Sequence, residues 1–78
     1  MVNLFVDMKV GTIIKFKRTI ETHGVLLKVE KKETTAVDTG KVVHSIIFYH
    51  FHLPETGKHV IYSDTSLEYY YDGILHEP

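Results

Sequence analysis

The 78-residue sequence has no cysteine, no tryptophan and only two prolines. Without cysteine the chain has no disulfide, although small domains of this size commonly need a disulfide, a metal or a partner subunit to supplement a small core. The lack of cysteine also fits a reducing compartment, so we expect a cytoplasmic protein.

Long apolar runs are absent as well. No stretch approaches the roughly 18 apolar residues that span a membrane, and the first residues carry no basic segment typical of a signal peptide. We therefore expect no membrane partner. The balance of 44% hydrophobic and 24% charged residues predicts one small globular domain over residues 1–78.

The net charge of −1 conceals an uneven distribution. Residues 1–32 hold seven basic against three acidic residues, a net of +4, and residues 33–78 hold two against seven, a net of −5. Solvated strand faces are the simplest interpretation of this asymmetry. The alternative is a basic face that meets an anionic partner.

Three segments show the alternation of apolar and polar residues that is typical of half-buried strands. They cover residues 11–18, 23–34 and 42–53. In the first, Ile14 and Phe16 share one face. In the second, one face carries Val25, Leu27 and Val29, and the other carries Leu26, Lys28 and Glu30. In the third, the face expected in the core carries Val43, Ile47, Tyr49, Phe51 and Leu53, and the opposite face carries His44, Ile46, Phe48, His50 and His52.

Two turn signals predict hairpins. Pro54 presets φ for the first corner of a turn that Gly57 ends with a positive φ, and a fourth strand follows at residues 59–63. The similar phrase from Asp38 to Gly40 predicts a second hairpin before the strand at residues 42–53.

The C-terminal region carries conflicting signals. Thr65 and Glu68 match a capping box that begins a helix, which Gly73 could close. The three consecutive tyrosines at residues 69–71 favour a strand instead. We predict a short helix, with an edge strand as the alternative.

Four or five strands and one short C-terminal helical turn predict an all-β domain. It would be a small SH3-like or OB-like barrel, or a bent antiparallel meander. The phrase Lys9-Val10-Gly11-Thr12-Ile13-Ile14-Lys15-Phe16 resembles the opening of SH3-like and KOW-type barrels, in which a turn glycine precedes the first alternating strand. The resemblance is one of shape and identifies no family.

Six histidines are an unusual number for this length. His50 and His52 project from the same strand face. If the turn covers residues 54–57, His52 stands opposite His59 on the next strand. Three clustered imidazoles can hold zinc or a similar metal, sense pH near neutrality, or simply form a half-exposed surface. No fourth ligand is evident.

Two other surfaces are candidates for binding. A basic surface for nucleic acid would consist of Lys15, Lys17, Arg18, Lys28, Lys31 and Lys32. Against it, the sequence pI of about 6.6 is low for such a protein. A protein-binding surface would consist of Tyr69, Tyr70 and Tyr71, because three adjacent tyrosines cannot all point inward and tyrosine is common at interfaces.

Catalytic motifs are not evident. Both Thr-Gly-Lys phrases lack the earlier glycine and the following Ser or Thr of a phosphate-binding loop, and no nucleophile elbow is present. We therefore expect a non-catalytic accessory, adaptor or inhibitor protein that binds another protein of unknown identity and forms homo-oligomers such as a homodimer. Nucleic-acid binding and zinc binding by His50, His52 and His59 are the alternatives.

Overall fold

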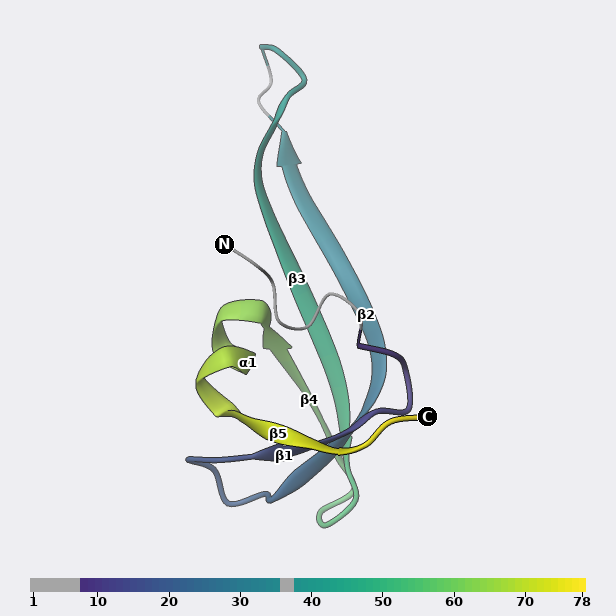
Figure 1. Cartoon of the computed structure of the whole chain (residues 1–78). Helices are drawn as coiled ribbons and strands as arrows, with labels where there is room; N and C mark the ends of the chain where they lie inside the picture. Colours follow the sequence, from purple (N-terminus) through teal and green to yellow (C-terminus); the bar gives the residue numbers. More distant parts are fainter. Residues whose placement is uncertain (1–7, 36–37) are drawn as a thin grey trace.

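The computed structural model describes residues 8–35 and 38–78. Within these residues, the elements in chain order are β1 (Ile13–Phe16), β2 (His23–Thr35), β3 (Val42–Leu53), β4 (Lys58–Ser63), α1 (Asp64–Tyr70) and β5 (Tyr71–His76) (Figure 1). The strands form one antiparallel sheet in the order β4-β3-β2-β1-β5. The predicted mainly β architecture with one short helix is therefore confirmed.

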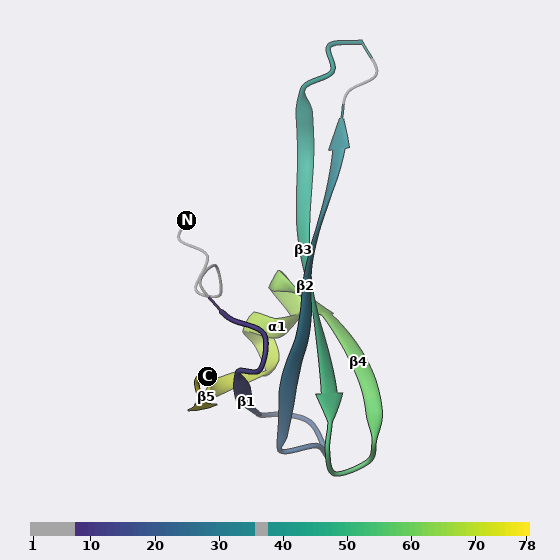
Figure 2. The ribbon, with the colours of Figure 1, turned by 90° about the vertical axis from the view of Figure 1, so that its right-hand side faces the viewer.

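The sheet is open rather than closed into a barrel. β4 and β5 lie at its two edges, and Figure 2 shows them as the outermost strands on opposite sides. Closure requires strands whose lengths and stagger match, whereas β2 has 13 residues and β1 only 4. Strands β1 to β4 follow one another as the predicted antiparallel meander, but β5 crosses to the other edge and pairs with β1. The predicted SH3-like or OB-like barrel is not confirmed.

β2 and β3 extend beyond their neighbours as a projecting two-stranded ribbon. β1 pairs with β2 only as far as Val25, and β4 pairs with β3 only as far as Phe48. The ribbon continues to the pair Thr35↔Val42, and the molecule measures 47 × 24 × 23 Å along its principal axes (Figure 1). The turn predicted after Asp38 lies at the tip, where Gly40 has a φ of 68°.

The core lies between one face of the sheet and α1. Its buried residues are Ile14, Phe16, Leu26, Tyr49, Phe51, Leu53 and Leu67. The predicted inward faces of β1 and β3 are therefore confirmed for the side chains that the structure describes. The side chain of Val43, also predicted to face the core, lies outside the described residues. Phe16 and Phe51 meet edge to face, with ring centroids 5.3 Å apart, an arrangement that adds to the stability from apolar burial.

The predicted faces of β2 are wrong after Leu26. A shift in register between Leu26 and Lys28 makes Leu27 the extra residue of a β-bulge. Leu26 is buried and Leu27 is exposed. Beyond the bulge, Lys28 pairs with His50, so Lys28, Glu30 and Lys32 lie on the histidine-bearing face of the sheet, whereas Lys31 and Glu33 lie on the other face.

The C-terminal region contains both predicted alternatives in succession. The helix is capped by Ser63, whose Oγ accepts a hydrogen bond from the Ser66 backbone N–H at 3.2 Å, rather than by Thr65. Ser63 already has the extended backbone of a cap because it ends β4. β5 then begins at Tyr71, so Gly73 lies inside a strand and does not close the helix.

Candidate functional site

β4 is a regular edge strand. Its residues pair with β3 without a bulge, and the predicted pairing of His52 with His59 is confirmed. The predicted turn is also present, with a hydrogen bond of 2.7 Å from the Gly57 N–H to the Leu53 carbonyl. β3 is the only strand in the described residues that pairs with β4. The backbone groups on the outer side of β4 therefore have no strand partner there.

The side chains of β4 are apolar in the middle of the strand. Ile61 is 54% exposed on the face that also carries His59, whereas Val60 and Tyr62 pack partly buried against the core on the other face. Burial of Tyr62 raises the pKa of its phenol. The only lysine or arginine within β4 is Lys58, at its first position. The centre of this edge thus combines unpaired backbone with exposed apolar surface.

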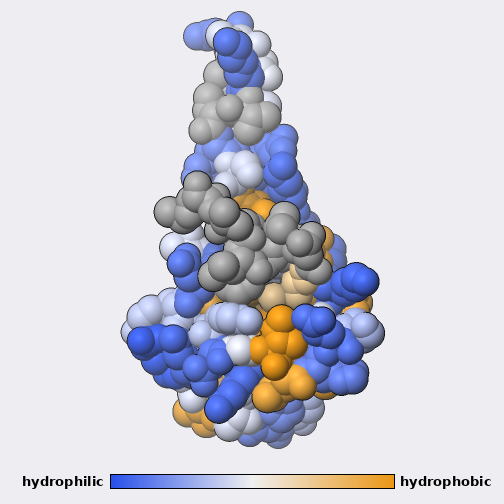
Figure 3. Space-filling view, viewed as in Figure 1, coloured by the Kyte–Doolittle hydropathy of each residue, from blue (hydrophilic) through white to orange (hydrophobic). Residues whose placement is uncertain are grey.

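β5 forms the opposite edge and is irregular. Its pairing with β1 shifts register twice within six residues, and Gly73 has a φ of 142°. Ile74 and Leu75 are 44% and 57% exposed, and Figure 3 shows hydrophobic surface over this part of the body, whereas the ribbon is largely hydrophilic in that view. Bulges bend an edge strand away from the straight geometry that a new strand requires.

The histidine face brings together two of the three predicted imidazoles. His50 Nδ1 lies 3.1 Å from His59 Nε2, and His50 Nε2 lies 3.2 Å from Glu30 Oε1. The hydrogen bond from His50, followed by the charge of Lys28, lowers the pKa of the Glu30 carboxyl. His52 lies on the same face but is exposed and outside this arrangement. Sequence reasoning missed Glu30 because the bulge at Leu27 determines its face.

The three tyrosines predicted as a protein-binding surface lie in different surroundings. Tyr69 is 55% exposed and lies beneath the Arg18 guanidinium, 4.7 Å from the ring centroid. Tyr70 packs on Tyr62 with ring centroids 5.2 Å apart, and Tyr71 is half-buried against the core. Tyr69 alone among them offers a largely exposed ring.

The basic residues predicted to bind nucleic acid are spread over several parts of the sheet. Lys15 pairs with Asp72 at 3.6 Å and Lys31 with Glu33 at 3.0 Å. Lys28 and Lys32 lie on the histidine face of β2, and Lys32 Nζ is 5.5 Å from the Phe48 ring centroid. Lys17 is exposed next to Arg18, whose side chain donates to the Tyr69 carbonyl at 2.8 Å.

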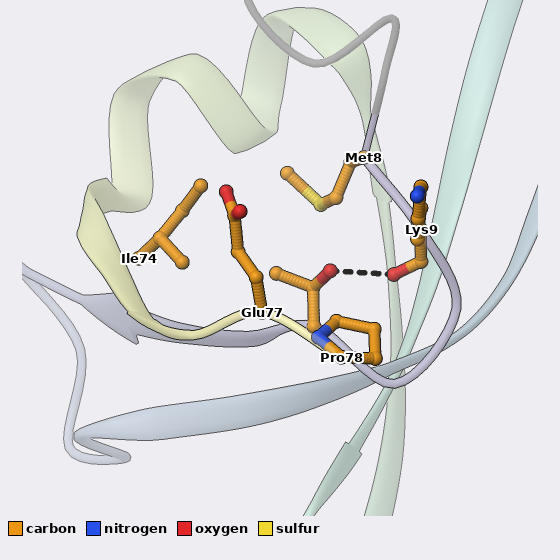
Figure 4. Close-up of a pocket in the computed structure, with 6 residues that line it drawn as sticks. Met8, Lys9, Ile74, Glu77 and Pro78 are labelled. Atoms are coloured by element: carbon orange, nitrogen blue, oxygen red, sulfur yellow. Dashed lines mark hydrogen bonds between the residues drawn. The ribbon is translucent and has the colours of Figure 1, made fainter.

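A cavity of about 210 Å³ lies between the two ends of the described chain. Its lining residues are Met8, Lys9, Thr12, Ile74, Glu77 and Pro78 (Figure 4). The Thr12 hydroxyl, the buried polar group at this site, donates to the Lys9 carbonyl at 2.6 Å. No sequence motif indicates this cavity, because residues far apart in the chain form it.

Comparisons with models of protein families, with functionally characterised proteins and with solved structures find no match. Among the helices that the structure describes, none has the length and apolar character needed to cross a membrane. Within residues 8–35 and 38–78, no three or more histidine, aspartate or glutamate side chains are already arranged so that they could hold a metal ion together.

Proposed function

We propose that this chain is a non-catalytic binding module, an accessory or adaptor protein that contacts other proteins by adding one of their strands to β4. The observation that carries the proposal is the regular, unpaired outer edge of β4 with Ile61 at its centre. Strand addition derives affinity from backbone hydrogen bonds and specificity from the side chains that flank the new strand.

In the part of the chain that the structure describes, β4 has neither the bulges nor the prolines that usually protect an edge strand. Proteins block such edges with bulges, prolines, lysines or covering elements. β5 has two register shifts, whereas β4 has none and carries only Lys58 at its start. A regular strand of six residues can form an uninterrupted ladder with an incoming strand.

A second copy of the chain is the partner that fits this edge best. A two-fold axis through Ile61, perpendicular to the sheet, pairs Ile61 with its own copy and Val60 with Tyr62 of the other copy. The same axis brings Lys58 to the end of the other β4, where Asp64 lies. Apolar side chains then meet at the centre and opposite charges at both ends, which is the self-complementarity that a symmetric dimer requires. One short strand buries little area, so we expect micromolar affinity.

Light scattering over a concentration series tests the proposal. The wild type should approach 18.0 kDa, twice the monomer mass of 9.0 kDa. Ile61→Lys should weaken the dimer at least about tenfold, because burial of an isoleucine contributes about 1.5–3 kcal/mol and symmetry counts it twice.

Ile74→Lys is the matched control, since it places the same charge on an exposed isoleucine of β5. It should leave the dimer intact. A wild-type mass of 9.0 kDa at every protein concentration would exclude the proposed dimer. If Tyr69→Ala abolishes the dimer and Ile61→Lys does not weaken it, the dimer contact lies at the end of α1 and not at β4.

Nucleic-acid binding is the second candidate, favoured by Lys28 and Lys32 on the histidine face of β2, where Lys32 lies beside the Phe48 ring. Basic side chains near an aromatic ring can contact phosphates and stack on bases. A labelled oligonucleotide should then shift at low salt, and Lys28→Glu/Lys32→Glu should abolish the shift, whereas Lys31→Glu on the opposite face should preserve much of it. No shift at low salt excludes this function.

A further inference from the structure

The imidazoles of His50 and His59 face each other across β3 and β4 with the spacing of two metal ligands. Their rings meet at 69° with centroids 5.2 Å apart, and His50 Nδ1 is 3.1 Å from His59 Nε2. Two nitrogens that bind one tetrahedral zinc ion at about 2.0–2.1 Å are themselves about 3.3 Å apart. An ion could therefore replace the proton between these rings with only a small movement of either one.

Glu30 is the hydrogen-bond partner that orients His50 as a metal ligand. Its carboxylate accepts from His50 Nε2 at 3.2 Å, which leaves Nδ1 directed at His59. Histidine ligands usually donate their second ring N–H to a carboxylate, and this bond fixes the tautomer and the ring orientation. The side chain of His50 is only 12% exposed, so the ring is also held by packing.

His52 is positioned to be a third ligand. It stands two residues from His50 on β3 and directly opposite His59 on β4, which places its Cβ about 5 Å from that of His59. As the side chains stand, His50 and His59 are in contact and His52 is exposed to solvent. Rotation of this exposed side chain would bring its ring toward the other two.

We infer that His50 Nδ1 and His59 Nε2 form a binding site for a zinc-like divalent cation, which His52 and water complete, with Glu30 as the outer partner of His50. Neutral imidazole nitrogens favour zinc, copper and nickel over magnesium and calcium, which prefer oxygen. The ion would fasten β4 to β3 in a small domain that lacks disulfides. The inference is independent of the proposed dimer.

Zinc titration of the untagged protein, followed by calorimetry and native mass spectrometry, tests the site. We expect one zinc ion per chain, with binding lost in His50→Ala and in His59→Ala and weakened in His52→Ala. His44→Ala is the matched control because His44 is an exposed histidine of β3 outside the pairing with β4, and it should bind zinc as the wild type does. Absence of bound zinc in the wild type overturns the inference, as does equal loss in His44→Ala.

Two further measurements separate ligand loss from misfolding. Glu30→Gln should weaken zinc binding by about 10–100-fold, the usual effect of losing an outer-shell partner, while circular dichroism shows an unchanged fold. Cobalt should give the visible absorption of a tetrahedral complex in the wild type and in His44→Ala but not in His59→Ala. An identical cobalt spectrum in His59→Ala would show that the ion binds elsewhere.

Discussion

β4 and β5 are edge strands of equal length in the same sheet, but they differ in regularity. β4 pairs with β3 in an unbroken register, while the pairing of β5 with β1 shifts twice. Exposed apolar side chains occur on both, with Ile61 on β4 and Ile74 and Leu75 on β5. Under the proposed strand addition, apolar exposure alone does not make an edge a docking site, because a new strand also needs a straight ladder of backbone groups.

The two edges are also fastened to the body in different ways. Around the junction of α1 and β5, the Lys17 N–H donates to the Tyr70 carbonyl at 2.8 Å and the Arg18 guanidinium donates to the Tyr69 carbonyl. Near the start of β4, Glu55 accepts from the Thr22 N–H at 2.9 Å and also from the Thr22 hydroxyl. In addition to the ladders of the two strands, the end of α1 before β5 is therefore held by backbone and guanidinium donors, and the turn before β4 is held by a titratable carboxylate.

Gly73→Ala should have the largest effect on stability of the changes considered for this comparison. The φ of 142° at Gly73 is one that residues with a Cβ rarely adopt, although the new methyl group would meet no atom within 4 Å. We expect the free energy of unfolding to fall by about 1–3 kcal/mol, measured by urea denaturation. Gly40→Ala is the control, since its φ of 68° lies in the left-handed region that alanine tolerates better. An equal loss in the free energy of unfolding for Gly73→Ala and Gly40→Ala would contradict the claim that the unusual backbone of β5 at Gly73 is important for stability.

Arg18→Ala should have a moderate effect that concerns the end of α1. The change removes the hydrogen bond to the Tyr69 carbonyl and the stacking on the Tyr69 ring. We expect a loss of about 1 kcal/mol in the free energy of unfolding. In Lys17→Ala the backbone bond to Tyr70 stays, so stability should change little. A larger loss in Lys17→Ala than in Arg18→Ala would contradict this account.

Glu55→Gln should produce the smallest effect of the three changes, and this effect should be visible only in the pH dependence of stability. Hydrogen bonds from the Thr22 hydroxyl and backbone, followed by the charge of His23, lower the pKa of its carboxyl. Because the pKa of Glu55 is lower in the folded state, its ionised carboxylate stabilises the fold at pH values above the ordinary glutamate pKa. This stabilisation disappears as the pH falls through the pKa of the folded state. Thermal melts from neutral to acidic pH should therefore fall less steeply for Glu55→Gln than for the wild type. Parallel curves would show that Glu55 does not fasten β4.

The sequence predicted the central hairpin well because its signals are local. Pro54 and Gly57 set the turn, and the turn sets the register that places His52 opposite His59. The alternation along β3 likewise predicted the burial of Phe51. Such features depend on residues close together in the chain, so they can be read without knowledge of the rest of the fold.

Other features depend on contacts between distant segments and could not be read in this way. The bulge at Leu27 brings Glu30 to the histidine face, but no glycine or proline marks it. The tyrosines at residues 69–71 indicated an edge strand only as an alternative to the helix, and β5 begins at Tyr71 because this residue pairs with Phe16, far away in the chain. The open sheet follows from the lengths of the paired segments, which local patterns do not determine.

Amide hydrogen exchange of the two edges at low and high protein concentration tests the central claim most directly. Because strand addition protects the outward N–H groups of the strand that receives it, the account predicts slower exchange in residues 58–63 at high concentration and unchanged exchange in residues 71–76. Slower exchange confined to β5, or no dependence on concentration at β4, would contradict it.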